Sequence, residues 1–482
     1  MGARVGAARK AALAALGDIR RRSGRARDVM RTSPRLSGLE GRDVALAERL
    51  VLGVTATSGQ LDGFINSHAK RPSSLQPQVR DALRLSTFEL CRLSTEPAVA
   101  VSQGVELVRS VVPRAAGLAN AVLHRVAEED APRVRAAVEA LSATSTNDPL
   151  GLALVSGWPT WLAEGVLFAL GGEAARAMAL STLEPAPIWV SGNVALHDRA
   201  ATREILASKG LKPIESPLPG CWRLASAAGL ATSGLISSAD VVTSDLAARL
   251  VARIASPAPG SSVLEVGQGR ATKTLLLEEV ACDAGRPARV VGIDSVASKR
   301  AIANERLAHG WGEWCRSLTF DARNLSSACL PAELNQTFDL VFVDAPCSGT
   351  GTMRRHPEIA WSLAPESVGS LPKGELPALQ LAILGAAATR VAPGGALVYS
   401  TCSILPSEDE EVVRAFLESP EGSGFSVQDV REAPGVLALS ASARAVVASN
   451  VDDCGFFRTH PVQGGPDGHF CARLVRNSEV SQ

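Results

Sequence analysis

The 482-residue sequence lacks the patterns of membrane and secreted proteins. No apolar run of about 18 residues is free of charge, so a membrane-spanning helix is not expected. The first residues, MGARVGAARKAALAALGDIRRR, are alanine-rich and followed by more arginines, which disfavours a secretory signal. Nine cysteines without a C-x-x-C pair fit neither a disulfide framework nor a zinc site. We therefore expect a soluble globular protein of the reducing cytoplasm, with no metal site and no membrane partner.

The scarcity of aromatic residues and the lack of a phosphate-binding motif narrow the range of ligands that the protein could bind. One tyrosine and 4% aromatic residues leave few rings for stacking on bases. The phosphate-binding pattern G-x-x-x-x-G-K-[ST] is missing, which disfavours a nucleoside triphosphate. Any binding to nucleic acid should therefore depend on charge and weaken strongly with salt.

The formal net charge of zero hides an asymmetry. Residues 1–127 carry 20 Lys and Arg against 10 Asp and Glu, whereas the rest of the chain carries 29 against 39. A basic first quarter favours a polyanionic partner, RNA or DNA. The alternative is a solvated helical surface that is rich in arginine.

The length predicts two or three domains. Residues 8–130 show no strand-like alternation, and GLANAVLHRVAEE places its apolar residues at one-face helical spacing, so an all-helical domain is expected there. Residues 131–235 begin with a polar connector, LSATSTNDPL, and continue with a strand (PIWVSGN), a helix (RATREILASKG) and a strand (CWRLAS). This segment is predicted to be a small α+β subdomain.

In residues 236–478 strands and helices alternate. SSVLEV is followed by TKTLLLEEV, and ARVVGID by SKRAIANERLAHG, before SLTFDA, FDLVFVDAP and GALVYSTC. Apolar strands separated by helices predict a Rossmann-like α/β domain whose parallel sheet is covered on both faces. Ligands of such sheets bind beyond the carboxyl ends of the strands. The strand-terminal residues that should meet at that edge are Glu265, Asp294, Asp321, Asp344 and Cys402.

The first of these strands leads into a glycine-containing turn, VLEVGQGRATKT. Gly267 and Gly269 permit a tight turn and close approach of a ligand, although fold maintenance alone could explain them. Asp294, 25 residues after Gly269, is placed to bind both hydroxyls of a ribose. Asp321 is placed to accept from an adenine amine. A single acidic strand end could be a helix cap, but several together predict an adenosine-containing cofactor, either a dinucleotide or S-adenosylmethionine.

Two cysteine-containing stretches carry the most specific signal. DAPCSGTGTMRRHPEIAW, residues 344–361, and STCSILPSEDEEVV, residues 400–413, resemble the signature motifs of RNA 5-methylcytosine methyltransferases, most closely the bacterial small-subunit ribosomal RNA enzymes of the RsmB (Sun) type. The resemblance covers nearly the whole chain. Residues 8–130 are similar to the NusB-like RNA-binding domain of that family, and DGHFCARL is similar to its last strand.

The resemblance implies roles for three of these residues. Cys402 would attack C6 of cytosine, which turns C5 into a nucleophile towards the methyl group of S-adenosylmethionine. Asp344 would hydrogen-bond the N3 and amine edge of the base, and it would also lie near the cofactor. Cys347 would help to remove the C5 proton and release the enzyme. Taken alone, either cysteine could be a small buried apolar residue.

Other residues are assigned more loosely. Arg354, Arg355 and His356 could hold phosphates beside the target base. Ser407 and Glu410 form an S-x-x-E capping box before the next helix.

The cofactor turn departs from the family pattern, which resembles D-L-C-A-A-P-G-G-K-T. Here residues 265–274 read EVGQGRATKT, so Lys273 and Thr274 match and the Pro-Gly-Gly core does not. If the turn needs a positive φ at position 271 or 272, the residue there would be strained by about 1–2 kcal/mol. A cation at position 270 is unfavourable beside a sulfonium unless it pairs with the cofactor's carboxylate. The expected cofactor-binding residues are Gly267, Gln268, Gly269, Arg270, Ala271, Thr272, Lys273, Asp294, Asp321 and Asp344.

The resulting hypothesis is a monomeric, cytoplasmic RNA (cytosine-C5)-methyltransferase that uses S-adenosylmethionine and acts on 16S ribosomal RNA. The altered turn favours an alternative, a non-catalytic NusB-like RNA-binding or antitermination factor with a degenerate methyltransferase domain. A nicotinamide-dependent oxidoreductase would fit the fold class but leaves both cysteine motifs unexplained.

Overall fold

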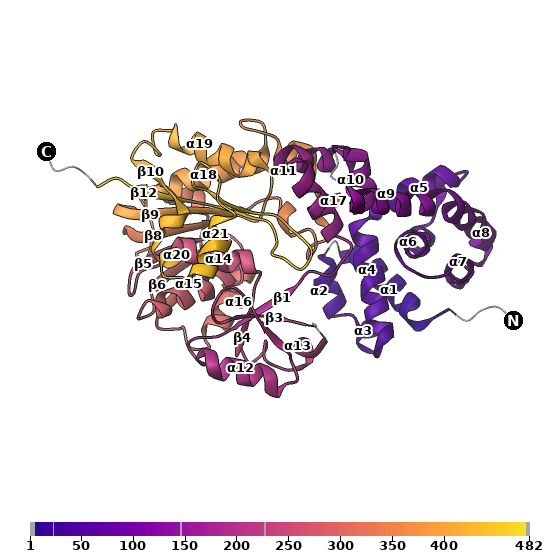
Figure 1. Ribbon diagram of the computed structural model, residues 1–482, viewed down its shortest axis with the longest axis horizontal. Helices are drawn as coiled ribbons and strands as arrows, with labels where there is room; N and C mark the ends of the chain where they lie inside the picture. Colours follow the sequence, from indigo (N-terminus) through magenta and orange to yellow (C-terminus); the bar gives the residue numbers. More distant parts are fainter. Residues whose placement is uncertain (1–4, 23, 145–146, 226–227, 479–482) are drawn as a thin grey trace. The chain divides into compact units, whose positions relative to one another are not determined.

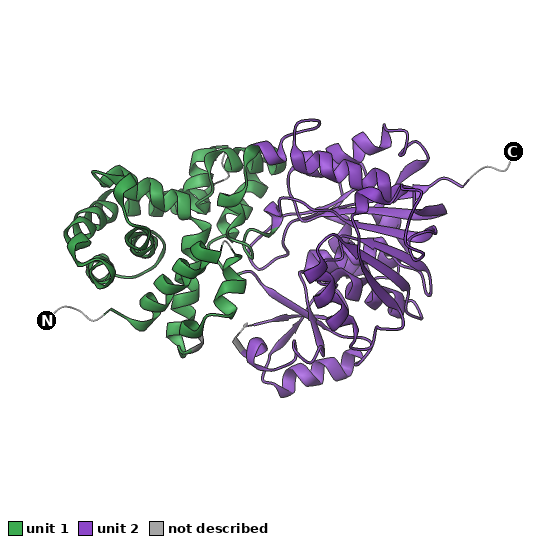
Figure 2. Cartoon of the chain, turned by 180° about the vertical axis from the view of Figure 1, so that it is seen from behind, with its two compact units in different colours: residues 1–185, 352–365 green, residues 186–351, 366–482 purple. Residues whose placement is uncertain are grey.

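The computed structural model describes residues 5–22, 24–144, 147–225 and 228–478. The chain forms two compact units, which Figure 2 shows in different colours. Unit 1 contains residues 1–185 and 352–365, and unit 2 contains residues 186–351 and 366–482. The chain therefore crosses between the units three times.

Unit 1 is helical in its described part, which confirms the helical domain predicted near the N-terminus. Helix α4 (Arg42–Ala56) illustrates the cause, because its buried residues between Ala47 and Val54 recur at three- and four-residue spacing and give it one apolar face. The other helices of this unit are α1 (Ala7–Arg22), α2 (Ala26–Arg31), α3 (Pro34–Ser37), α5 (Ser58–His68), α6 (Pro77–Arg92), α7 (Pro97–Val111), α8 (Ala116–Arg125), α9 (Ala131–Ala143), α10 (Pro149–Ser156), α11 (Thr160–Ser181) and α17 (Ile359–Ser362).

Residues 352–365 come from the middle of the chain yet pack within unit 1. The indole Nε1 of Trp361 donates to the carbonyl oxygens of Ala56 and Gly157, both at 3.0 Å. A Cβ at Gly59 would lie 2.1 Å from the Trp361 ring, so only glycine leaves room for it. The second half of the first cysteine motif is therefore anchored in the helical unit.

The segment 131–235 does not form one subdomain. Its first part is helical, α9 to α11, and belongs to unit 1, because helices α10 and α11 bury apolar side chains among their helical neighbours. Its second part forms a small antiparallel sheet of order β2-β3-β1-β4 in unit 2. The strands are β1 (Ile188–Gly192), β2 (Pro213–Glu215), β3 (Cys221–Leu224) and β4 (Val241–Thr243), with helices α12 (Arg199–Ser208) and α13 (Ala228–Thr232).

The larger sheet of unit 2 has eight strands among the described residues, and its main path runs β10-β12-β9-β8-β5-β6-β7 (Figure 1). Strands β5 to β9 are parallel, as predicted, whereas β10, β11 and β12 pair antiparallel, so the sheet is mixed. The strands are β5 (Ser262–Val266), β6 (Arg289–Asp294), β7 (Cys315–Thr319), β8 (Phe338–Asp344), β9 (Val391–Thr401), β10 (Phe425–Gln428), β11 (Phe457–Thr459) and β12 (His469–Arg476).

Successive residues of the central strands feed two different cores. Val263 and Phe342 face one core with helices α14, α15 and α16, whereas Leu264 and Val343 face another with α18 and α19. This double burial explains the nearly continuous apolar strands. The helices of this domain are α14 (Leu246–Ala255), α15 (Thr272–Asp283), α16 (Ala297–Leu307), α18 (Glu375–Ala388), α19 (Glu410–Leu417), α20 (Pro434–Leu437) and α21 (Ala441–Ala448).

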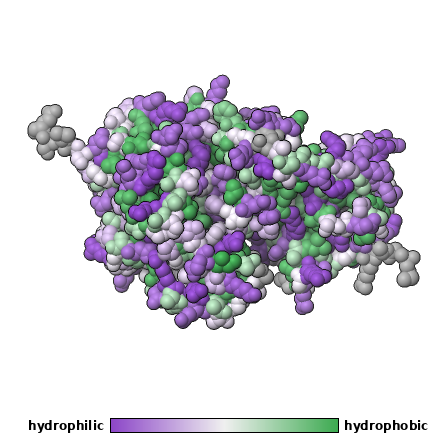
Figure 3. Space-filling view, viewed as in Figure 1, coloured by the Kyte–Doolittle hydropathy of each residue, from purple (hydrophilic) through white to green (hydrophobic). Residues whose placement is uncertain are grey.

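The apolar content is absorbed mainly by these cores. On the face seen in Figure 3, hydrophilic residues spread over much of the surface with smaller hydrophobic areas between them. Within the described residues no single helix is long and apolar enough to cross a membrane; helices α10 and α11 meet that test only as a pair bent by 114°.

Candidate active site

Strand register brings the two cysteine motifs together. In the parallel pair β8–β9, Asp344 lies opposite Ser400, so the residues that follow the two strands leave the sheet side by side. The sulfur atoms of Cys347 and Cys402 are 3.4 Å apart, and both side chains are half-buried. Two thiols from positions 55 residues apart thus lie together at the carboxyl edge of the sheet.

A half-buried ion pair lies beside this thiol pair. The ammonium Nζ of Lys273, in the first turn of α15, lies 2.5 Å from Oδ1 of Asp344 at the end of β8. Burial lowers the pKa of Lys273, but the charge of Asp344 and the hydrogen bond to it outweigh burial and raise it above the ordinary value. The site therefore keeps a cation next to the sulfur atoms.

The two thiols are not equivalent. The hydrogen bond from Cys347 lowers the pKa of Cys402; burial opposes this shift, and the charge of Lys273 supports it. The same hydrogen bond raises the pKa of Cys347, and burial raises it further. The thiolate is the nucleophilic form of cysteine, and the surroundings therefore favour that form at Cys402 and the protonated thiol at Cys347.

The second cysteine motif contains two buried carboxylates, Glu408 and Asp409. Glu408 accepts hydrogen bonds from residues next to both cysteines, among them Ser348 and Ser403. Asp409 accepts a hydrogen bond of 2.6 Å from the Thr401 hydroxyl and pairs with Arg458 at 3.0 Å. Burial raises the pKa of Asp409 well above its ordinary range, although Arg458 opposes the shift.

The predicted cofactor turn, residues 267–271, joins β5 to α15. Its φ angles are positive at Gly267 (80°), Gly269 (59°) and Ala271 (59°), so the turn is built on left-handed backbone. A Cβ at Gly267 would lie 2.2 Å from the carbonyl oxygen of Asp344. The turn and the first cysteine motif are therefore in direct contact, and glycine at 267 permits that approach. At position 271 the positive φ falls on alanine, as the sequence comparison had suggested it could.

A chain of buried polar groups supports the turn from below. The Gln268 amide donates to the Thr274 hydroxyl at 3.2 Å, and that hydroxyl donates to Glu265 Oε2 at 2.5 Å. Glu265 is fully buried, its Oε1 has no hydrogen-bond partner, and burial raises its pKa to about 8. Glu265 therefore supports the turn from within the core rather than lying open at the sheet edge.

The carboxylates at the next strand ends are acceptors of the kind that an adenosine-containing cofactor needs. Asp294 ends β6, and its carboxylate accepts the N–H groups of Gly269 (3.1 Å) and Val296 (2.8 Å) while remaining at the edge of the sheet. Asp321 follows β7 and keeps 36% of its side chain exposed, with its carboxylate held by Arg323. Two carboxylates on successive strand ends beside a glycine turn suit ribose hydroxyls and an exocyclic amine.

Arg270 and the arginine-rich stretch were also predicted to take part. Arg270 is exposed, and its carbonyl oxygen accepts from Arg306 (2.6 Å), which also bonds the Thr272 hydroxyl (2.8 Å). Arg354, Arg355 and His356 are half-buried in unit 1, where Arg27 donates to the Arg355 carbonyl oxygen at 2.7 Å. These three residues thus belong to the helical unit by packing.

The predicted capping box is wrong. The Ser407 hydroxyl donates to the carbonyl oxygen of Val368 at 2.6 Å and leaves the start of α19 uncapped, and Glu410 pairs with Arg458. The chain turns sharply at Asp409, which draws Ser407 away from the helix. The same sharp turn directs Glu408 inwards, a role for which the sequence offered only one acidic residue within an acidic run.

Internal pairing uses part of the basic charge of the first quarter. Arg9 pairs with the buried Glu89, and Arg84 pairs with Asp62 at 2.5 Å. Other arginines between the starts of α1 and α4 are exposed and could face a polyanion, although Arg20, Arg21 and Arg31 also pair with Asp81, Asp18 and Asp28. They are Arg20, Arg21, Arg22, Arg25, Arg31, Arg35 and Arg42.

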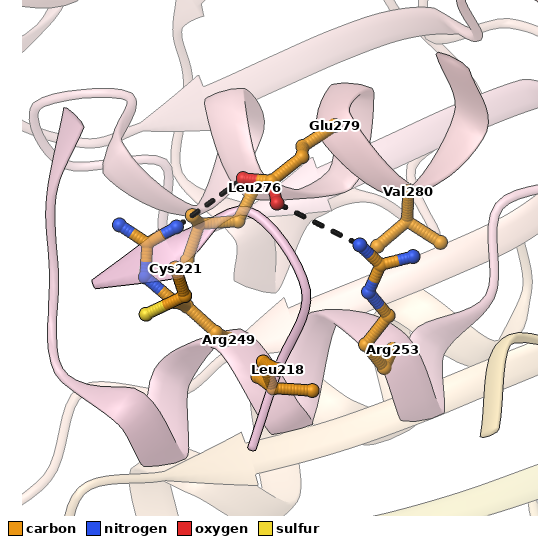
Figure 4. A pocket seen from close by; sticks show the side chains of 7 residues that line it. All are labelled: Leu218, Cys221, Arg249, Arg253, Leu276, Glu279 and Val280. Carbon is orange, nitrogen blue, oxygen red and sulfur yellow. Dashed lines mark hydrogen bonds and ion pairs between the residues drawn. The ribbon is translucent and has the colours of Figure 1, made fainter. Parts of the chain in front are cut away.

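A small cavity in unit 2 has no part in this site. Figure 4 shows Glu279 of α15 between Arg249 and Arg253 of α14, at 3.2 Å and 3.6 Å, with Cys221 and Leu218 beside them. Both arginines are paired, Arg249 with Glu279 and Arg253 with Glu279 and Asp283, and none of the residues that line the cavity was predicted to be functional. Its role is structural.

The comparisons with known proteins agree with this geometry. The family model of the 16S rRNA methyltransferase RsmB/F matches residues 252–475, and that of the NusB family matches residues 6–128. The ribosomal RNA small subunit methyltransferase B of Thermus thermophilus is 32% identical over 99% of this chain and 100% of its own length. That of Salmonella typhi is 29% identical over 82% and 86%.

The solved structure of PH0851 has the same fold, with a TM-score of 0.73, 20% identity, and coverage of 98% of this chain and 100% of its own. Because the Thermus thermophilus methyltransferase matches this chain over nearly its full length, the comparisons do not support the oxidoreductase alternative. The chain therefore belongs to the 16S rRNA methyltransferase RsmB/F family and is an S-adenosylmethionine-dependent methyltransferase.

Proposed function

We propose that this protein transfers a methyl group from S-adenosylmethionine to C5 of a cytosine in 16S ribosomal RNA, through a transient bond between Cys402 and C6 of the base. The observation that carries the proposal is the pair of sulfur atoms 3.4 Å apart, beside the ion pair of Lys273 and Asp344. One thiol can bond to carbon while the other is within reach of the same ring.

Each step has a residue suited to it. The Cys402 thiolate forms the bond to C6 while N3 takes a proton from water, which it returns when the ring is restored, and the Asp344 carboxylate accepts hydrogen bonds from N3–H and the amine. The electron pair released at C5 takes the methyl group that S-adenosylmethionine supplies when bound. Cys347 then passes its own proton to water and, as a thiolate, takes the C5 proton, while the electrons of the C5–H bond expel the Cys402 sulfur. The base regains its aromatic ring and the thiolate is restored.

The cofactor is assigned to the turn of residues 267–271 and the adjacent strand ends. The turn, with Thr272 and Lys273 after it, would surround the methionine part, and Arg270 would pair with its carboxylate. Asp294 would bind the ribose hydroxyls and Asp321 the adenine amine. The positive φ angles of the turn and the partial exposure of Asp321 support this assignment.

The helical unit would hold the RNA through its exposed arginines, and Arg354 and Arg355 would contact phosphates near the base. Because such binding rests on charge, it should weaken strongly with salt. We also propose that the protein is a monomer, that it is located in the cytoplasm, and that it acts on RNA away from any membrane.

The test compares two variants, each with one cysteine replaced by alanine, in reactions with 16S ribosomal RNA and labelled S-adenosylmethionine. Cys347→Ala should accumulate a protein–RNA adduct that survives denaturation, because it forms the Cys402 bond but fails to release it. Cys402→Ala should give neither adduct nor methylation. Cys329→Ala changes an exposed thiol elsewhere in unit 2 and should behave like the wild type.

Two other outcomes would replace the proposal. Adduct formation in Cys402→Ala and none in Cys347→Ala would make Cys347 the nucleophile. If the wild type formed no adduct, transferred no methyl group and failed to bind S-adenosylmethionine in a calorimeter even with RNA present, the non-catalytic RNA-binding alternative would be correct.

A further inference from the structure

The strongest feature not yet assigned a function is the carboxylate of Glu408. It is 0% exposed and lies six residues after Cys402, in the turn before α19. None of the hydrogen bonds described for its carboxylate comes from a cationic side chain. A buried carboxylate supported by neutral donors alone is costly, so its surroundings indicate what it does.

Its contacts join the two cysteine loops, which we define as residues 345–351 and 402–409. Oε1 accepts from the backbone N–H of Ser348 at 2.8 Å, and Oε2 accepts from the hydroxyls of Ser348 at 2.5 Å and Ser403 at 2.6 Å. Ser348 directly follows Cys347, and Ser403 directly follows Cys402. One carboxylate therefore fixes the residue after each thiol.

Gln380 of α18 completes the arrangement. Its Nε2 donates both to Glu408 Oε1 and to the carbonyl oxygen of Pro346, each at 2.9 Å. Both partners are acceptors, so the amide nitrogen must face them, and its Oε1 is left buried without a partner. With four donors the carboxylate has about its full complement of hydrogen bonds, and the hydroxyl distances are those of bonds to an ionised acceptor.

The charge of Glu408 also acts on the thiols. The groups that face Cys347 are the Cys402 thiol, the Glu408 carboxylate, the Lys273 ammonium and the phenol of Tyr399 on β9, with Asp344 beyond Lys273. The hydrogen bond to Cys402 is the largest cause that raises the pKa of Cys347, and the charge of Glu408 adds to it. The same charge opposes ionisation of Cys402, where the Lys273 cation counteracts it.

We propose that Glu408 is a positioning residue of the methyl-transfer site, which holds the two cysteine loops in register and keeps the proton on Cys347 until C5 has been methylated. The inference rests on the proposed function, because it assigns Cys347 to proton removal. A proton kept on Cys347 prevents a second thiolate from forming beside the first before the base is attacked. The relative position of the two cysteine loops matters equally, because Cys402 must reach C6 while Cys347 must reach the proton on C5, the neighbouring ring atom.

Two substitutions separate the effect of the Glu408 charge from that of its side-chain length. Glu408→Gln keeps the length and removes the charge, so the pH midpoint for alkylation of Cys347 should fall by about one unit, which is about tenfold in rate at a fixed pH. Glu408→Asp keeps the charge but withdraws it by one methylene. It should leave that midpoint close to the wild type and slow methylation about tenfold or more, because the carboxylate no longer reaches both serines.

Alkylation is measured in the Cys402→Ala background by mapping the Cys347 peptide after iodoacetamide treatment across pH, without RNA or cofactor. Glu410→Gln is the matched control, since Glu410 lies two residues away and pairs with Arg458 rather than with a cysteine loop. An unchanged midpoint in Glu408→Gln, or wild-type methylation in Glu408→Asp, would overturn the proposal.

Ser403→Ala keeps the test decisive if Glu408→Gln fails to fold. It removes one donor from Oε2, which leaves the negative charge less neutralised, so the Cys347 midpoint should rise rather than fall. A midpoint that falls or stays constant would contradict the inference. Because alkylation needs neither substrate, a chain that shows these shifts yet never methylates RNA would retain Glu408 as the organiser of the thiols and disprove the proposed function alone.

Discussion

The cofactor turn and the cysteine loops occupy the same edge of one sheet but are held by different means. Three of the five turn residues, Gly267, Gly269 and Ala271, have positive φ, so backbone conformation shapes the turn. The cysteine loops instead depend on side chains, since a buried carboxylate gathers donors from both. Left-handed backbone therefore recurs through the turn, which side chains also support from below, whereas hydrogen bonds to one carboxylate join the two cysteine loops.

The difference explains which half departs from the family pattern. A turn fixed by backbone conformation can change its residues provided that the left-handed positions remain tolerable, and Ala271 shows that even alanine is accommodated. A hydrogen-bond network has no such freedom, because loss of one partner leaves a buried polar group unpaired. The two cysteine motifs accordingly match the family pattern, whereas the turn reads GQGRA.

The largest expected effect comes from the point where the two halves touch. Gly267→Ala should destabilise the protein by about 3–5 kcal/mol, because its Cβ would lie 2.2 Å from the Asp344 carbonyl oxygen, in addition to the left-handed strain. Binding of S-adenosylmethionine should fall with it. Denaturant unfolding and calorimetry measure the two quantities.

Gly269→Ala is the matched control for that substitution. Its φ is also positive, but the nearest atom to the new Cβ would be 3.8 Å away, so only strain of about 1 kcal/mol is expected. Equal losses in the two variants would mean that the contact between turn and strand end contributes nothing, and that the turn and the thiol loops are independent.

The sequence predicted much of this edge because period and strand ends are local signals. The strands that end at Asp294 and Asp344, and the strand that precedes Cys402, could be located from apolar runs alone, and parallel order then placed their ends together. The family model and the full-length relatives confirm the methyltransferase that the cysteine motifs predicted.

What the sequence could not supply was the partner of each side chain. Glu408 lies in an acidic run that reads as a helix start, and Gln380 lies in an apolar helix with no motif at all. Their roles depend on contacts across 60 and 28 residues, which no local pattern encodes. The helices of residues 131–181 were missed for a related reason, since packing into unit 1 rather than their own pattern defines them.

An effect of intermediate size is expected for Glu265, which lies beneath the turn and should make the free energy of unfolding depend on pH. Burial raises the pKa of Glu265 to about 8, so the folded state holds that proton more tightly than the unfolded state does. The free energy of unfolding should therefore fall as pH rises from about 4.5 to about 8 and stay low above that range. Glu265→Gln removes this dependence, and between pH 5 and pH 7 it should lose about 2.5 kcal/mol less than the wild type.

The measurement is urea unfolding of both proteins at several pH values, because every other titrating group is common to them. Glu305→Gln, on the exposed side of α16, gives the slope expected from a surface carboxylate. Parallel curves for wild type and Glu265→Gln would show that this carboxyl ionises as freely in the fold as outside it, and that the turn rests on no buried charge.

The smallest effect concerns the alanine that adopts a glycine conformation. Ala271→Gly should relieve about 1 kcal/mol of left-handed strain and lose about 0.8 kcal/mol from the buried methyl group, leaving stability within about 0.5 kcal/mol of the wild type. Ala301→Gly, at an exposed position inside α16, has no strain to relieve and should cost about 1 kcal/mol. Equal losses in the two variants would mean that Ala271 sits without strain, and the turn would then owe its shape to packing, as the cysteine loops owe theirs to hydrogen bonds.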